Sequence, residues 1–238
     1  MSAISVILAS YNGELYIREQ IDSILSQLRQ CDELIITDDG SNDNTINVVQ
    51  SYVDRDPRVT LIAGPQRGVI ANFEFGIKHA TNDIICLSDQ DDVWKQNKVE
   101  TICKLFAEDP RTTCVLHDVY IVDKNLRASG PSFFSLRGSK LGLINNLFKN
   151  SYMGSAMAFR KTMLKYILPI PSNVPMHDQW IGLVNEIYGH SVMCYEKLGL
   201  YRRHEDNVSS FVHGSIPHMI SSRFFLILNL IKIRMNYR

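Results

Sequence analysis

The chain has 238 residues, and its 25 lysine and arginine residues equal its 25 aspartate and glutamate residues. A chain of this length can form one domain with a large core, or a domain with two lobes. The balanced charge lacks the basic footprint of a nucleic-acid-binding surface, so no nucleic-acid partner is expected.

The five cysteines are scattered and form no Cys-x-x-Cys pair. They are therefore expected to be core thiols of a protein in a reducing compartment. A strand is predicted to begin at Ile4, which leaves no room for a signal peptide. We expect a cytoplasmic protein, in which the glycosylation triplet Asn207-Val208-Ser209 would have no use.

Apolar runs alternate with segments of helical spacing through the first half of the chain. Strands are predicted at residues 4–8, 33–37, 59–63 and 84–87. The helices between and after them are predicted around Ile17 to Leu28, Ile46 to Val53, residues 68–80 and Val99 to Phe106. In the second helix Ile46, Val49 and Val53 should face inward, with Ser41 or Asn42 as the cap. Strands that alternate with helices predict a mostly parallel α/β sheet.

Three carboxylates, Asp89, Asp91 and Asp92, follow the fourth predicted strand. Packing does not explain this cluster, because burying unpaired like charges is costly. A divalent cation does explain it, since Mg²⁺ and Mn²⁺ prefer oxygen ligands and Mg²⁺ is commonly held by carboxylates plus substrate phosphates. The alternative is a solvated acidic turn, with Asp92 as the cap of a helix over residues 94–106.

A second acidic pair, Asp38 and Asp39, follows the strand predicted at residues 33–37. The carboxyl ends of parallel strands lie along one edge of a sheet, where open α/β proteins bind ligands. We therefore expect the two acidic clusters to converge there. A turn and helix cap is the alternative explanation for this pair.

Three motifs follow one another in the first half, namely Ser10-Tyr11-Asn12-Gly13, Asp38-Asp39-Gly40-Ser41 and Asp89-Gln90-Asp91-Asp92. Their order resembles that of family 2 glycosyltransferases with the GT-A fold. In the second half, residues 155–160 resemble the segment that lines the family's acceptor site. Residues 176–180 resemble its Glu-Asp motif, and residues 201–207 resemble a motif of the bacterial rhamnosyltransferase-like branch.

The resemblance implies a site for a nucleoside-diphosphate sugar with Mg²⁺ or Mn²⁺. Asp91 would bind the metal, His204 would be a further metal ligand, and Asp89 would support the metal or the ribose. Asp39 would contact the base or ribose, in a pocket also lined by Ser10, Tyr11 and Asn12. Two alternatives stay open, namely a buried core role for Tyr11 and a surface position for His204.

The same resemblance places acceptor chemistry in the second half. Asp178 would be the general base that takes the acceptor hydroxyl's proton, although a carboxylate at a helix start is often only a cap. His177 stands where glutamate is commoner, and would either titrate near neutrality or face solvent. Asp118 is predicted at a strand end near the donor sugar, and Arg203 would contact the diphosphate or line a solvated strand. The remaining acceptor-site residues are Gly154, Ser155 and Trp180.

We therefore expect one GT-A-like α/β domain, with a donor-binding half at residues 1–118 and an acceptor-binding half at residues 119–238. Its expected activity is inverting transfer of a sugar, from dTDP-rhamnose or a UDP-hexose, to a glycan or lipid-linked glycan in bacterial surface polysaccharide synthesis. One alternative is a nucleotidyltransferase, for which a Gly-rich signature bearing Arg or Lys is absent near the first strand. Another is a non-catalytic nucleotide-sugar-binding module.

An apolar stretch, residues 224–231, lies near the C-terminus between Arg223 and Lys232. It is far shorter than the roughly 20 residues needed to span a bilayer. An amphipathic helix here would lie at the inner face of the plasma membrane, with its basic groups on anionic lipids. A core helix or a homodimer helix is the equal alternative.

Overall fold

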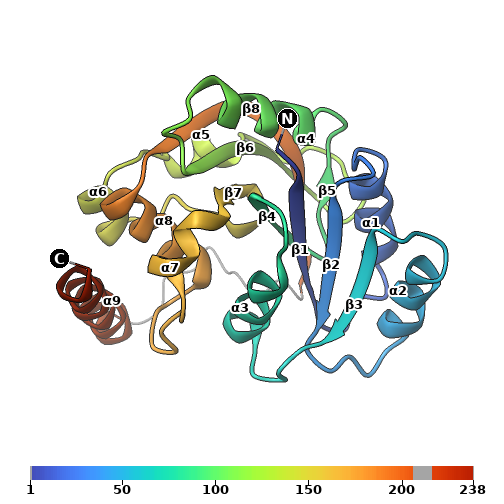
Figure 1. Cartoon of the computed structure of the whole chain (residues 1–238), viewed down its shortest axis with the longest axis horizontal. Coiled ribbons are helices and arrows are strands. Elements are labelled where there is room, and N and C mark those ends of the chain that lie inside the picture. Colours follow the sequence, from blue (N-terminus) through green and yellow to red (C-terminus); the bar gives the residue numbers. More distant parts are fainter. Residues whose placement is uncertain (1, 206–215, 238) are drawn as a thin grey trace.

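The computed structural model describes residues 2–205 and 216–237. Its centre is a curled, mixed sheet of eight strands in the order β3-β2-β1-β4-β7-β6-β8-β5, flanked by helices (Figure 1). The strands are β1 (Ile4–Ser10), β2 (Glu33–Asp38), β3 (Val59–Ala63), β4 (Ile84–Asp89), β5 (Val93–Trp94), β6 (Cys114–Val122), β7 (Met157–Arg160) and β8 (Ser191–Arg202). The α/β class predicted from the sequence is confirmed.

The strands β1 to β4 pair in parallel, as the alternation of strands and helices predicted. The helices between and after them are α1 (Ile17–Leu25), α2 (Thr45–Val53), α3 (Val69–His79) and α4 (Lys98–Glu108). Successive residues of β1 enter opposite cores, since Val6 packs with α1, α2 and α4 while Ile7 packs with α3. Both faces of the sheet are therefore covered, as the uninterrupted apolar strands require.

The α2 region differs from the sequence prediction in two ways. Ile46 is 42% exposed, and the buried face is formed by Thr45, Val48, Val49 and Tyr52. The helix begins at Thr45, so neither Ser41 nor Asn42 is its cap. Val49 faces inward as predicted, but the rest of the buried face was missed because it begins at the polar Thr45, which an apolar pattern passes over in favour of Ile46.

The second half of the chain completes the same sheet. Strand β7 pairs antiparallel with both β4 and β6, while β8 runs parallel to β6. The helical segments here are α5 (Phe133–Arg137), α6 (Leu143–Phe148), η1 (Gly154–Ala156), η2 (Lys161–Met163), α7 (Leu164–Ile167) and α8 (His177–Tyr188). Both expected halves thus contribute strands to one sheet.

The last helix, α9 (Ile216–Asn236), lies at one end of the molecule, and α2 lies near the other end (Figure 1). Leu226 and Leu230 are buried against the core, which confirms the core-helix alternative for that face. The opposite face is exposed at Phe224, Ile227, Leu228, Ile231 and Met235. Among the described residues, no helix has the length and apolar character needed to cross a membrane.

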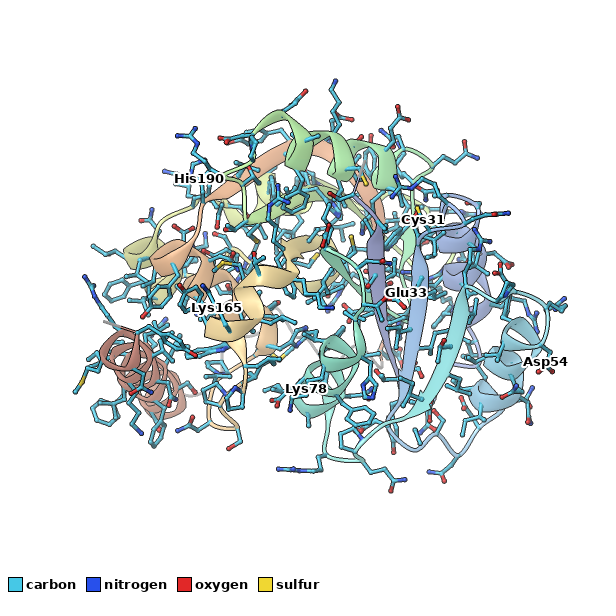
Figure 2. The ribbon with its side chains drawn as sticks, viewed as in Figure 1. Cys31, Glu33, Asp54, Lys78, Lys165 and His190 are labelled. Carbon is cyan, nitrogen blue, oxygen red and sulfur yellow. The ribbon has the colours of Figure 1, made fainter. Side chains whose placement is uncertain are left out.

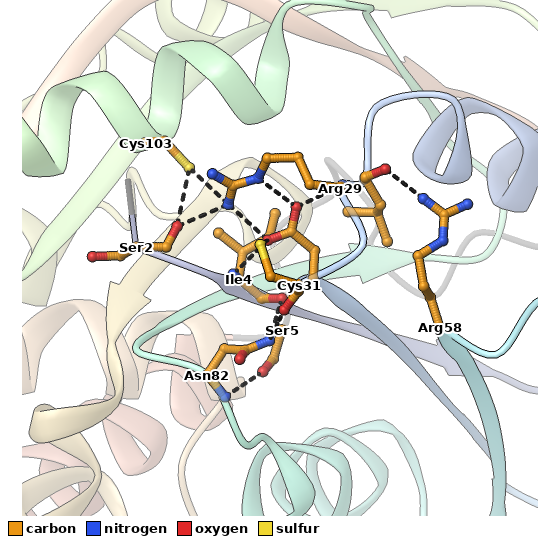
Figure 3. A network of polar contacts seen from close by, with 10 residues as sticks. Ser2, Ile4, Ser5, Arg29, Cys31, Arg58, Asn82 and Cys103 are labelled. Carbon is orange, nitrogen blue, oxygen red and sulfur yellow. Dashed lines mark hydrogen bonds and ion pairs between the residues drawn. The ribbon is translucent and has the colours of Figure 1, made fainter.

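A polar network holds the amino ends of the strands (Figure 3). The Asp32 carboxylate accepts hydrogen bonds from the Ile4 N–H at 2.9 Å and from the Arg29 guanidinium at 2.7 and 2.8 Å. Nearby, the Glu33 carboxylate, labelled in Figure 2, accepts hydrogen bonds from Ser5 and Thr81. These bonds fix the relative register of β1 and β2, and so the positions of their carboxyl ends.

Candidate active site

The carboxyl ends of β1, β2 and β4 meet at one edge of the sheet, which we call the carboxyl edge. Ser10 at the end of β1 pairs with Asp38 of β2, and Ala9 pairs with Asp89 of β4. The predicted convergence of the two acidic clusters is therefore confirmed. The parallel register brings together carboxylates that lie about fifty residues apart in the sequence.

Asp38 builds the turn after β2. Its side chain is buried and accepts hydrogen bonds from the backbone N–H groups of Gly40 and Ser41 at 3.1 and 2.7 Å, and from the Ser10 hydroxyl at 2.8 Å. Asp39 instead accepts from the N–H of Gly68 at 2.7 Å, at the start of α3. The turn explanation thus describes Asp38, and the cap explanation describes Asp39, which binds the N-terminus of α3.

The loop after β1 is held by the acidic turn that contains Gln90 and by the segment after β2 that contains Asn42. The Tyr11 N–H donates to the Gln90 side chain at 2.9 Å, and that side chain donates back to the Tyr11 carbonyl. Asn12 has a positive φ of 49°, and its side chain accepts from the Asn42 N–H at 2.8 Å. The Tyr11 side chain is 53% exposed, so the core role considered for it is wrong.

The acidic turn between β4 and β5 is clamped by the end of β8. The Arg202 N–H donates to the Asp92 carboxylate at 3.1 Å, and its guanidinium donates to the Asp91 carbonyl at 2.8 Å. Asp92 is therefore not the cap of a helix, because Val93 and Trp94 form β5 and the helix begins only at Lys98. Burial, together with the charge of Asp91, raises the pKa of Asp92 to about 7.

His204 lies directly against Asp91, with its Nε2 atom 2.9 Å from a carboxylate oxygen. Its ring also lies 4.8 Å from the ring of Tyr16, centroid to centroid. A carboxylate and an imidazole are suitable ligands for Mn²⁺, and a donor diphosphate would supply further oxygens. No three His, Cys, Asp or Glu side chains within residues 2–205 and 216–237 are arranged to hold a metal on their own. The donor set therefore fits a metal that is shared with a bound diphosphate.

Asp178 lies in the first turn of α8 and is almost fully buried. One carboxylate oxygen accepts from the Gly154 N–H at 3.1 Å, and the other accepts from the Gln179 N–H at 2.6 Å. Burial raises the pKa of Asp178 to about 6. The pKa of Asp89 is also raised, first by burial, then by the charges of Asp92 and Asp91, and to a smaller extent by the charge of Asp178. The candidate base therefore acts on the same electrostatic environment as the carboxyl edge.

His177 differs from both sequence expectations. It is buried rather than solvent-facing, and its ring stacks on Phe73 at a centroid distance of 4.0 Å. Burial lowers its pKa to about 3, so it stays neutral near pH 7 instead of titrating there. Neither of its ring nitrogens has a hydrogen-bond partner among the residues that the structure describes.

Comparison with known proteins identifies the family of this chain. The model of glycosyl transferase family 2 matches residues 5–168, which is more than half of the sequence. The chain belongs to glycosyltransferase family 2. That match includes both acidic clusters and the Gly154–Ser155 segment, and it ends before Asp178.

Among its relatives, an uncharacterized glycosyltransferase of Nostoc sp. is 28% identical over 91% of this chain. The chondroitin synthase of Pasteurella multocida is 30% identical over 53% of the chain, which corresponds to 13% of that enzyme. The chain spans 66% of the length of the Nostoc relative and 60% of the length of an uncharacterized relative from Mycobacterium bovis.

Solved structures share the fold at low identity. Residues 1–349 of S. aureus TarS, in complex with UDP-GlcNAc, superpose with a TM-score of 0.77 at 17% identity, covering 96% of this chain and 66% of that one. The mannosyltransferase PcManGT of Pyrobaculum calidifontis, in complex with GDP-Man and Mn²⁺, gives 0.63 at 20% identity over 84% and 56%. The fold of this family 2 chain is thus that of the GT-A glycosyltransferases.

Three other predicted site residues of this family 2 chain make contacts within the fold. Asp118 lies inside β6, not at a strand end, and accepts from the N–H groups of Val119 and Phe134 at 2.8 and 2.9 Å. Trp180 is fully buried, and its indole N–H donates to the Ile167 carbonyl. The Arg203 guanidinium donates to the Tyr201 hydroxyl at 3.0 Å. Residues 206 and 207 of the C-terminal motif, and the triplet at 207–209, lie outside the described residues.

Sequence reasoning did not identify two residues that hold the site together. Gln90 bridges the acidic turn to the loop after β1, and Lys98 donates to the Ser155 carbonyl at 2.8 Å. A glutamine between aspartates and a lysine at a helix start are ordinary in a sequence. Only the burial of Lys98 in the fold distinguishes it.

Proposed function

We propose that this chain is an inverting glycosyltransferase that moves a sugar from a nucleoside-diphosphate donor to a hydroxyl acceptor. The observation that supports it most is the grouping of three features, the paired Asp91 and His204, the carboxyl edge, and the buried carboxylate of Asp178. The first two suit a donor diphosphate with its metal. The third suits proton removal from an acceptor.

The nucleotide would occupy the carboxyl edge. The exposed ring of Tyr11 offers a stacking surface for the base, and Asp39 lies at the N-terminus of α3. Asp91 and His204 would hold Mg²⁺ or Mn²⁺ between them and the diphosphate, where the cation would offset the charge that develops on the leaving group. Asp89 would support this end of the site.

Asp178 would accept the proton of the acceptor hydroxyl. Its pKa of about 6 leaves it ionised at neutral pH, yet close enough to neutrality to act as an effective base. The Gly154 and Gln179 N–H groups fix the orientation of its carboxylate. Inversion requires this base on the face of the sugar opposite the leaving group, as in inverting glycoside hydrolysis.

The donor we favour is dTDP-rhamnose or a UDP-hexose, and the acceptor a glycan or lipid-linked glycan of a bacterial surface polysaccharide. The motif at residues 201–207 supports the first through its resemblance to the rhamnosyltransferase-like branch. TarS binds UDP-GlcNAc and the Pyrobaculum enzyme binds GDP-Man, which supports a nucleotide sugar without selecting one.

The exposed face of α9 would rest on an anionic membrane surface, consistent with a cytoplasmic protein that reaches a lipid-linked acceptor. Phe224, Ile227, Leu228, Ile231 and Met235 share one side of the helix at helical spacing. Lys232 and Arg234 flank this stripe on its two sides, and α9 contains no carboxylate. This pattern complements anionic lipid. Pairing of two such helices in a homodimer would instead bring like charges together.

A thermal-shift screen tests the proposed function. UDP, GDP, dTDP and their sugars would be added with and without Mn²⁺, and a matching donor should raise the unfolding temperature by mass action. Release of pyrophosphate from a nucleoside triphosphate and a sugar 1-phosphate would instead support the nucleotidyltransferase alternative. Stabilisation by nucleotide sugars without any turnover would support a binding module.

A further inference from the structure

A buried lysine lies behind the acidic turn. Lys98, the first residue of α4, is only 1% exposed, although lysine is almost never fully buried unless it is paired. Its Nζ atom donates to the Ser155 carbonyl at 2.8 Å and lies 4.0 Å from the centroid of the Trp94 ring. The ammonium group is thus held by a carbonyl and an aromatic face.

The surroundings of Lys98 are costly for a charge. Burial lowers its pKa to about 7, against the opposing effect of the Cys86 thiol and the carboxylates of Asp92 and Asp89. An unbranched apolar side chain such as methionine would fill similar space without the cost of removing a charge from water. Packing alone therefore does not account for a lysine here.

The carbonyl that Lys98 holds belongs to the short turn η1 (Gly154–Ala156), which also contacts the candidate base. The N–H of Gly154, one residue before Ser155, donates to the Asp178 carboxylate at 3.1 Å. The turn also packs tightly on α8, because a Cβ atom at Gly154 would lie 2.8 Å from the Nε2 atom of His177. Lys98 and Asp178 are therefore hydrogen-bonded to adjacent residues of the same turn.

We propose that Lys98 is a positioning residue for sugar transfer. By holding the Ser155 carbonyl it fixes η1, and the Gly154 N–H of that turn orients the Asp178 carboxylate. Through these two hydrogen bonds η1 joins α4, the helix that follows the acidic turn, to α8. Lys98 therefore also helps to fix the position of Asp178 relative to the carboxyl edge. This inference rests on the proposed role of Asp178 as the general base.

The variant Lys98→Met removes the donor and the charge while keeping most of the volume. Ile102→Val is the matched control, since it loses a methyl group from a buried position of the same helix, in a different hydrophobic cluster from Ala156 of η1. Hydrogen exchange of the peptide spanning residues 151–158 measures the turn directly. The Gly154 amide should exchange roughly five- to tenfold faster in Lys98→Met, as expected for a weakened hydrogen bond, and at the parent rate in the control.

Turnover supplies the second readout. The probe is the nucleotide sugar from which the parent protein releases most nucleoside diphosphate in the presence of Mn²⁺. Lys98→Met should lower that rate by roughly 10- to 100-fold, the range for a misplaced catalytic group, and leave the affinity for the nucleoside diphosphate within about threefold. The acid limb of the rate should also move to higher pH, because the Gly154 N–H helps to keep the pKa of Asp178 down.

Parent-like exchange at Gly154, or parent-like turnover, would overturn the inference. Equal losses of turnover in Lys98→Met and Ile102→Val would also overturn it, since destabilisation alone would then explain the effect. If Lys98→Met does not fold, Lys98→Gln keeps a neutral donor and should show the same changes at smaller size. A parent protein that hydrolyses no nucleotide sugar would contradict the proposed function instead, and the exchange rates would still decide whether Lys98 holds the turn.

Discussion

Replacing Asp178 by asparagine should separate the chemistry of the site from its stability. The substitution keeps the shape of the side chain and removes the basic oxygen. If Asp178 is the general base, transfer should fall by roughly 10²- to 10⁴-fold, the usual span for the loss of such a group. Donor affinity should stay within a few-fold, because Asp178 lies on α8 and not on the loops of the carboxyl edge.

The effect on stability follows from two opposing contributions. Burial raises the pKa of Asp178 to about 6, compared with roughly 3.9 in an unfolded chain. The folded state therefore binds this proton more tightly, and its advantage is complete below about pH 4 and lost as the pH rises through 6. At pH 7.5 the ionised carboxylate costs about 3 kcal/mol of folding free energy, which asparagine would relieve.

Asparagine introduces a cost of its own at this position. The two carboxylate oxygens accept from different N–H groups, those of Gly154 and Gln179, and an amide has only one oxygen. One buried N–H would then face an NH₂ group, at a cost of about 1–3 kcal/mol. The free energy of unfolding at pH 7.5 should therefore stay the same or rise, by no more than about 2 kcal/mol.

Release of nucleoside diphosphate and calorimetric unfolding measure the two effects. The control is Ile181→Val, at a fully buried position of the same helix, which should lose about 0.5–1.5 kcal/mol of stability and little activity. The parent rate should also decline as the pH falls below about 6. Near-parent turnover of Asp178→Asn would refute the base assignment. The neutral, buried imidazole of His177 would then be the neighbouring group to test.

Three further predictions concern the metal, the fold and the membrane. Asp91→Asn and excess EDTA should each weaken nucleoside-diphosphate binding, measured by calorimetry with Mn²⁺, and full binding in EDTA would contradict the metal assignment. Asp32→Ala should lower the free energy of unfolding by about 3 kcal/mol, because the Ile4 N–H loses its acceptor and the Arg29 guanidinium loses its carboxylate partner, keeping its hydrogen bond to the Ser2 carbonyl. Burial alone would raise the pKa of Asp32, but hydrogen bonds from Arg29 and Ile4 lower it. This stabilisation should therefore be present above about pH 4 and be lost as the pH falls through the lower folded-state pKa. Urea titrations at pH 7 and pH 3 measure the difference. Ile231→Glu should release the protein from anionic liposomes in a sedimentation assay while Ile46→Glu, at the other end of the molecule, should not, and equal binding of both variants would contradict the membrane surface.

The sequence was a good guide to the parallel strands and to the edge where they end. Apolar runs of four to six residues bounded by turn residues have few alternatives, and the register of β1 with β2 and β4 then places Asp38 and Asp89 together. The helix predicted around Val99 to Phe106 is observed as α4 (Lys98–Glu108). Features determined by local pattern could thus be predicted.

Features determined by packing could not be predicted. Nothing near His177 in the sequence indicates that Phe73 stacks on it from α3. The two-residue strand β5 replaced the expected helix start because Val93 and Trp94 pair with β8, about a hundred residues later. Asp118 lies inside β6 because that strand continues to Val122, past a register shift that no spacing rule reveals.

The most direct test of the central claim is the release of nucleoside diphosphate from nucleotide sugars by the parent protein and by Asp91→Asn, each with Mn²⁺. dTDP-rhamnose, UDP-glucose, UDP-N-acetylglucosamine and GDP-mannose form a suitable panel. We predict that the parent releases nucleoside diphosphate from one donor or a closely related group of donors, and that Asp91→Asn loses most of this activity. Equal release by the two proteins would contradict a donor site at the carboxyl edge, and no release from any nucleotide sugar by the folded parent would contradict the proposed transfer itself.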